Sequence, residues 1–134
     1  MFTLASAIVD SPISALLARI VLTTLFWMAG LYGVFNFNAI VQEMVHEKLP
    51  VPVVFAVATI ATQLLGSALV ITNFQGYGWV GAVGLAVFTL LTIPFGHAFW
   101  TFEEPRRTAE FHIALEHITV AGGLLLAAIY LAKR

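Results

Sequence analysis

Four polar side chains that can perform chemistry gather near the ends of two successive apolar segments: His97, His112, Glu116 and His117. His112 and Glu116 are four residues apart and therefore share one face of a helix. Imidazole and carboxylate groups can donate, accept and transfer protons near neutral pH. If the two segments are antiparallel helices joined by a short loop, we expect His97 to meet at least one of the other three inside the bundle.

Three roles are open for these four residues. Two histidines and a carboxylate can bind a metal, but no HExxH-type spacing is present, and we expect no metal site. The groups can instead hydrogen-bond and protonate the head group of a quinone or of another polar ligand. The third role is a hydrogen-bond network between helices without any ligand, in which Glu116 is protonated or bonded to one of the histidines.

A second polar pair, Arg19 and Gln63, is expected in the first two apolar segments. Arg19 shares a helix face with Thr23, Gly30 and Gly33. A rise of about 1.5 Å per residue puts Arg19 and Gln63 within about 5 Å of each other in depth, inside the reach of an arginine side chain. We expect either a contact that orients two packed helices or one wall of a small-molecule pocket.

The composition is that of a membrane protein. Of the 134 residues, 60% are hydrophobic and only 10% are charged, against roughly 45–50% and about 25% in soluble domains. The stretch from residue 49 to residue 102 contains no Asp, Glu, Lys or Arg, and it is long enough for two crossings of about 20 residues each. We therefore expect an integral membrane protein that contacts the lipid bilayer.

The hydropathy pattern predicts an all-α polytopic protein with four transmembrane helices in an antiparallel bundle. The crossings are expected at about residues 13–35, 51–72, 79–100 and 111–132, within a single membrane domain over residues 1–134. Residues 36–49 have apolar side chains at helical spacing but are too polar to span, which predicts an interfacial amphipathic helix. Residues 1–12 lack the basic and apolar regions of a signal peptide and are expected to form an uncleaved tail.

Several classes of function and structure are excluded or favoured by simple counts. A net charge of −1 with six scattered cations excludes nucleic acid as a partner. The absence of cysteine excludes disulfides, thiolate-held metals and thiol exchange. Both termini are expected on one side of the membrane, and Lys133-Arg134, without neighbouring acids, favours the cytoplasmic side. Close helix packing is expected at small residues: Gly66, Gly81, Gly84, Gly122 and Gly123.

Four segments resemble a known family. They are Ala18-Arg19-Ile20 followed by Phe26 and Gly30, the run Leu49-Pro50-Val51-Pro52, residues 96–100 and residues 118–125. Together they resemble the opening, middle and end of DoxX-like membrane proteins, over roughly residues 17–128. The resemblance implies a small four-helix protein of the bacterial inner membrane, in a family whose name-giving members are associated with a thiosulfate- and quinone-linked oxidoreductase.

The resemblance also bears on individual residues. Arg19 and His97 match polar residues that are typical of the family. Gly33 stands where the family usually has a lysine, Gln63 where it often has a glutamate, and Glu116-His117 where a Lys-Asn pair is common. Activity that depends on those missing charges does not carry over to this chain.

Residues and resemblance together indicate an accessory or quinone-binding component of a redox-linked membrane complex. Such a component would contact membrane or peripheral redox proteins, or further copies of itself. Two alternatives stay open. A membrane enzyme acting on a hydrophobic substrate needs a ligand at His97, Glu116 and His117. A small transporter or channel needs polar lining in both halves of the membrane, which Arg19 and Gln63 together with the histidine and glutamate residues would supply.

Overall fold

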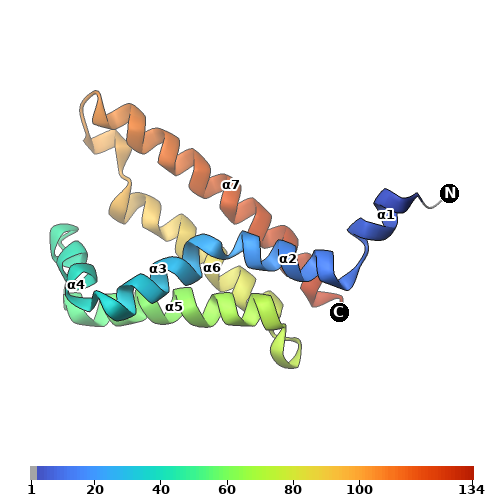
Figure 1. Ribbon diagram of the computed structural model, residues 1–134. Helices are drawn as coiled ribbons and strands as arrows, with labels where there is room; N and C mark the ends of the chain where they lie inside the picture. The colour runs from blue at the N-terminus through green and yellow to red at the C-terminus, as the bar shows by residue number, and fades with distance from the viewer. Residues whose placement is uncertain (1–2) are drawn as a thin grey trace.

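The structure, a computed structural model, describes residues 3–134, and every regular element in that range is a helix (Figure 1). Helix α1 and the C-terminal end of α7 lie at one end of the molecule, and α4 and the α6–α7 connection lie at the other. The elements are α1 (Leu4–Val9), α2 (Pro12–Leu22), α3 (Thr24–Phe35), α4 (Phe37–His46), α5 (Pro52–Thr72), η1 (Phe74–Gly76), α6 (Gly78–Gly96), η2 (Phe99–Thr101) and α7 (Arg106–Ala132).

Three stretches are individually long and apolar enough to cross a membrane: α5, α6 with its extension to Thr101, and α7. Helices α2 and α3 satisfy the same criteria only when they are taken together as one bent pair. The all-helical architecture is thus confirmed for the described residues, with three candidate membrane-spanning helices or, if the bent pair is one span, four. The complete four-helix antiparallel arrangement stays a prediction.

The first expected span is not one continuous helix. It breaks at Thr23, and α2 and α3 are bent by 52° at this point. The buried Thr23 hydroxyl donates to the carbonyl of Arg19 at 2.7 Å, and the Thr24 hydroxyl donates to that of Ile20 at 2.9 Å. Threonine hydroxyls that bond back to the preceding turn in this way bend helices, and two in succession account for the break.

Glycine permits the close approach of α6 to α5. A Cβ atom on Gly81 would lie 2.7 Å from the carbonyl oxygen of Gly66, and one on Gly66 would lie 2.7 Å from Leu85. The expected packing role is therefore observed for both residues, and a Cβ atom added to Gly123 would lie 3.4 Å from Leu22, at an ordinary van der Waals distance. The predicted packing role is not observed for Gly84 and Gly122, where a Cβ atom would meet no other described residue within 4 Å.

Helix α4 has the predicted amphipathic character, and part of its apolar face packs on protein. Ile40 is buried against Ala56 and Ile60 of α5, with Val41 and Met44 beside them. The polar side chains of α4, including Gln42, point away and are exposed. The α4–α5 contact holds α4 against α5 at the end of the molecule where His97 also lies. The interfacial position of α4 stays a prediction.

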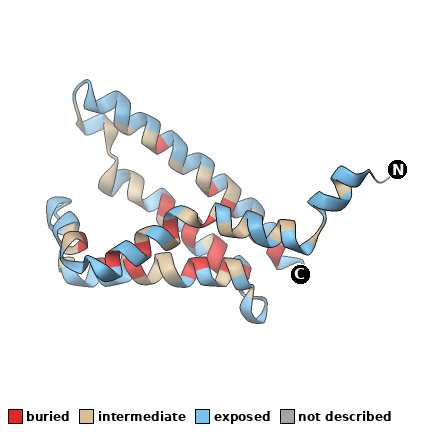
Figure 2. Cartoon of the chain, in the orientation of Figure 1, coloured by how far each residue is buried: buried red, intermediate tan, exposed pale blue. Residues whose placement is uncertain are grey.

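The largest apolar core lies where α3, α5, α6 and α7 meet, and buried residues in Figure 2 concentrate along these contacts. Around this core the outer surface is also apolar. Leu126 of α7 is 70% exposed and Leu65 of α5 is 66% exposed. Large exposed apolar surfaces of this kind are rare in soluble monomers and are suited to contact with lipid.

Candidate ligand site

His97, directly after α6, is held by a carboxylate of α7. Its Nδ1 lies 2.7 Å from Oε2 of Glu110, and the two side chains are only 28% and 14% exposed. Helix α7 begins at Arg106, five residues before the expected start of the fourth span, so Glu110 belongs to the helix and faces α6. With a Glu110 oxygen as the acceptor, His97 donates from Nδ1, and no residue among 3–134 hydrogen-bonds to its Nε2.

His117 completes a cluster with these two residues. Its ring centroid lies 4.8 Å from that of His97, edge to face. Its Nδ1 donates to the carbonyl of Ile113 at 2.8 Å, because a carbonyl oxygen can only accept. His117 therefore also keeps Nε2 free. His97, Glu110 and His117 are called the histidine cluster below.

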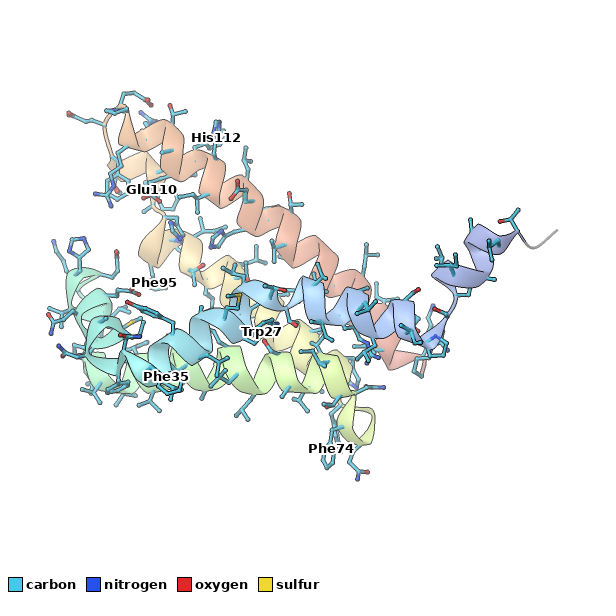
Figure 3. All side chains as sticks on the ribbon, viewed as in Figure 1. Trp27, Phe35, Phe74, Phe95, Glu110 and His112 are labelled. Carbon is cyan, nitrogen blue, oxygen red and sulfur yellow. The ribbon has the colours of Figure 1, made fainter. Side chains whose placement is uncertain are left out.

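His112 and Glu116 do not join this cluster, contrary to the sequence-based expectation. Both side chains are exposed, and Figure 3 shows His112 pointing away from the body of the bundle, whereas Glu110 lies on the side that faces it. The helical repeat explains the difference, since residues 110, 113 and 117 follow one face of α7 and residues 112 and 116 another. Of the fourth-span trio, only His117 meets His97.

A groove of about 340 Å³ opens beside the C-terminal end of α4, and it is called the α4–η2 groove below. Lys48 reaches it because α4 ends in a Schellman-type turn: Leu49 N–H bonds to Met44 O at 3.0 Å, and Lys48 takes a left-handed φ of 59°. The groove is lined by His46, Glu47, Lys48, Pro94, Phe95, Gly96, Ala98, Thr101, Phe102 and Arg106.

Arg106 joins the groove to the histidine cluster. Its guanidinium carbon lies 3.8 Å from the ring centroid of Phe102, a cation–π contact within the groove lining. On the other side its Nε lies 3.7 Å from Oε1 of Glu110, whose second oxygen contacts His97. A ligand that contacts Arg106 in the groove would thus be connected through Glu110 to Nδ1 of His97. His97 itself does not line the groove, although both of its neighbours do.

Arg19 occupies the opposite end of the molecule and does not pair with Gln63. Its Nη1 donates to the carbonyl of Val70 at 3.2 Å, and its Nε donates to that of Ala15 at 3.2 Å. Val70 lies in the last turn of α5, where carbonyls have no partner within the helix and favour a cation. Gln63 lies two turns earlier, against Gly30. Arg19 precedes Gly30 by eleven residues, about 16 Å along a helix, and this offset separates the pair.

Replacing Arg19 by leucine should therefore destabilise the α2–α5 contact. The substitution leaves the Val70 carbonyl without its charged donor, and we expect the free energy of unfolding to fall by about 1–3 kcal/mol. Thermal unfolding in detergent measures this loss. Lys133→Leu is the control, because Lys133 is an exposed cation at the same end of the molecule. Equal effects of the two substitutions would contradict the role assigned to Arg19.

Sequence reasoning missed Glu110, Arg106 and the groove. The predicted third span ends at about residue 100 and the fourth begins at about residue 111, so Glu110 falls in the predicted loop between them. The spacing of Arg106, Glu110 and His117, at i, i+4 and i+11, places the three residues on one face of a helix. This spacing could have identified Glu110 as a helical residue.

Comparison with known proteins supports the fold and its location. The family model described as DoxX matches residues 14–98, a range that includes Arg19 and His97 and ends before Glu110. The inner membrane protein YphA of Escherichia coli (strain K12) is 25% identical over 118 residues, covering 88% of this chain and 83% of YphA. No solved structure matches. Because the family model covers well over half of the 134 residues, the chain belongs to the DoxX family.

Proposed function

We propose that the α4–η2 groove binds the polar head of a quinone-like amphiphile and that the protein is an accessory component of a redox-linked membrane complex. The observation that carries the proposal is the arrangement around Arg106, which lines the groove and contacts the carboxylate of the histidine cluster. The relative YphA is named as an inner membrane protein, and we propose the same membrane for this chain, with its termini in the cytoplasm.

The groove lining has the chemistry that a quinone head requires. Quinone carbonyls accept hydrogen bonds, and Lys48 and Arg106 carry donors. Phe95 and Phe102 supply aromatic surface on which a planar ring can stack. Phe95 is also 54% exposed at the end of α6, so an apolar tail can leave the groove along the outside of that helix. An amphiphile thus has a polar and an apolar contact at the same place.

The histidine cluster supplies proton handling beside the bound head group. Reduction of a quinone adds electrons and protons together, and imidazoles with a free Nε2 can pass protons near neutral pH. Glu110, hydrogen-bonded to His97 at 2.7 Å, fixes which nitrogen of that ring is free. In this proposal the electrons come from a membrane or peripheral redox partner, and this chain binds the quinone and exchanges protons with it.

The α4–η2 groove and Arg19 lie far apart in the molecule, and this favours a binding role over a transport role. A transporter needs polar groups that continue through the membrane, but the α4–η2 groove and Arg19 lie at opposite ends. The largest core cluster between the long helices is apolar and includes Phe26, Leu85 and Leu124. No contact among the described residues favours a complete enzyme active site over a binding site, so the accessory role is preferred.

Neighbouring arginines test the proposal. Arg106→Gln should weaken the binding of a short-chain ubiquinone to protein in nanodiscs at least about tenfold, because it removes a charged donor worth about 1.5–3 kcal/mol. Arg107→Gln removes the same charge from the next residue, which is exposed and does not line the groove, and should leave the affinity unchanged. Equal affinities of the two variants, measured by titration calorimetry, would refute the groove as the quinone site.

A further inference from the structure

Charged side chains are divided unequally between the two ends of the molecule. The end formed by α1, α2 and the C-terminal end of α7 carries three cations, Arg19, Lys133 and Arg134, against one acid, Asp10. The opposite end, at α4, the α6–α7 connection and the start of α7, carries more acids than cations. The acids there are Glu43, Glu47, Glu103, Glu104 and Glu110, and the cations are Lys48, Arg106 and Arg107. A local excess of positive charge attracts anions.

A pocket of about 300 Å³ opens at the positively charged end, and it is called the arginine pocket below. Small-molecule sites have volumes of about 300–1,000 Å³, so this pocket has room for a small ligand or a head group. It is lined by Asp10, Pro12, Ala15, Arg19, Thr72, Asn73, Tyr130, Leu131 and Arg134. Two of the three cations at this end therefore line one pocket.

The arginine pocket has more hydrogen-bond donors than the protein itself uses. Arg19 gives two of its five N–H groups to backbone carbonyls, and no residue among 3–134 accepts from the other three. The side-chain oxygen of Asn73 accepts from a backbone N–H at 2.9 Å, which leaves its amide nitrogen as a donor. The guanidinium carbon of Arg134 lies 4.6 Å from the ring centroid of Tyr130, and a guanidinium over a ring keeps the N–H groups at its edge available.

The arginine pocket lies where two candidate spans end. Helix α5 ends at Thr72 and α7 ends at Ala132, so the pocket is at the level where the hydrocarbon core of a membrane gives way to the head groups. Tyrosine, here Tyr130, is typical of this level. The exposed apolar side chains of Ile13 and Ile129 are next in sequence to lining residues, so acyl chains attached to a bound head group would contact apolar surface.

We propose that the arginine pocket binds a phosphate group and that the phosphodiester of an anionic phospholipid is its occupant. A guanidinium can donate two parallel N–H bonds to the oxygens of one phosphate. Arg19 and Arg134 supply two such groups, and Asp10 is the one acid in the lining among residues 3–134. Basic pockets between transmembrane helices bind lipid head groups by this chemistry. Free phosphate offers the same oxygens without the tails, and the experiments below distinguish the two sources.

The neighbouring cations at the end of α7 provide a matched test. Arg134 lines the pocket and Lys133 does not, and both are exposed. Native mass spectrometry of the full chain in mild detergent measures the binding of added dioleoylphosphatidylglycerol. Arg134→Gln should lower the association constant at least about tenfold, the loss expected from one hydrogen bond between charged groups, whereas Lys133→Gln should bind like the original chain. Equal association constants of the two variants would overturn the proposal.

Asp10 gives a prediction of the opposite sign in the same assay. Asp10→Asn removes the negative charge from the pocket lining, and the association constant for the same lipid should rise roughly two- to fivefold, the effect of one exposed charge. An unchanged or lower association constant would contradict the electrostatic basis of the site.

Two further ligands identify the source of the phosphate. Dioleoylglycerol has the same tails without the phosphate and should bind at least about tenfold more weakly than the phosphatidylglycerol. Equal binding would mean that the tails alone are recognised and would overturn the phosphate site. Inorganic phosphate lacks the apolar contacts of the tails and should also bind at least about tenfold more weakly. Inorganic phosphate that binds as tightly as the lipid, with the same dependence on Arg134, would overturn the lipid as the occupant.

Discussion

Replacing Gly81 by alanine should destabilise the protein by about 1–3 kcal/mol, the usual cost of adding a methyl group to a packed core. The new Cβ would lie 2.7 Å from the backbone carbonyl oxygen of Gly66 and 2.7 Å from Cβ of Leu69. Neither atom is the end of a flexible side chain, so α5 and α6 must move apart. Reversible unfolding in mixed micelles measures the loss.

Gly84→Ala is the matched control, one turn further along the same helix. Its added methyl group would meet nothing within 4 Å. Alanine is also a better helix former than glycine by up to about 1 kcal/mol, so this variant should be as stable as the original chain or slightly more stable. Equal destabilisation by the two substitutions would mean that α5 and α6 do not meet at Gly66 and Gly81.

Replacing Glu110 by leucine should have the second large effect on stability. The substitution removes the acceptor of His97 and the partner of Arg106 together. A half-buried donor left without an acceptor costs about 1–3 kcal/mol, and we expect a fall of that size in the free energy of unfolding. The same unfolding assay applies, because α7 retains its helical residues in this variant.

Glu110→Gln separates packing from proton chemistry. The glutamine carbonyl oxygen can still accept from Nδ1 of His97, so this variant should unfold close to the original chain. It removes the ionisable group, however, and should slow proton uptake by a bound quinone during reduction by an added electron donor. Glu116→Gln is the control, because Glu116 is exposed and lies outside the cluster. Equal stability of the leucine and glutamine variants at residue 110 would contradict the hydrogen bond.

The helices could be predicted from the sequence because long apolar stretches leave few alternatives in a membrane. Residues 51–72, for example, form α5 over Pro52–Thr72. His97 could be identified as a candidate for the same reason, since a polar group in an apolar segment is conspicuous.

The break of the first span and the members of the histidine cluster could not be predicted in this way. The bend at Thr23 depends on hydroxyls that bond back to the preceding turn, and threonine occurs in straight helices as well. The rotation of α7 about its own axis decides that Glu110, and not Glu116, faces His97. That rotation is set by contacts with α6, and the spacing along one helix leaves it undetermined.

Photolabelling with an azidoquinone is the most direct test of the proposed quinone site. The protein in nanodiscs would be irradiated with the analogue, with and without excess unlabelled quinone, and the labelled peptides would be identified by mass spectrometry. The proposal predicts competable labelling of residues 94–106, with Lys48 and its neighbours on the facing wall. Labelling around Asp10, Arg19 and Tyr130 at the opposite end, or labelling of exposed apolar residues that excess quinone does not reduce, would contradict it.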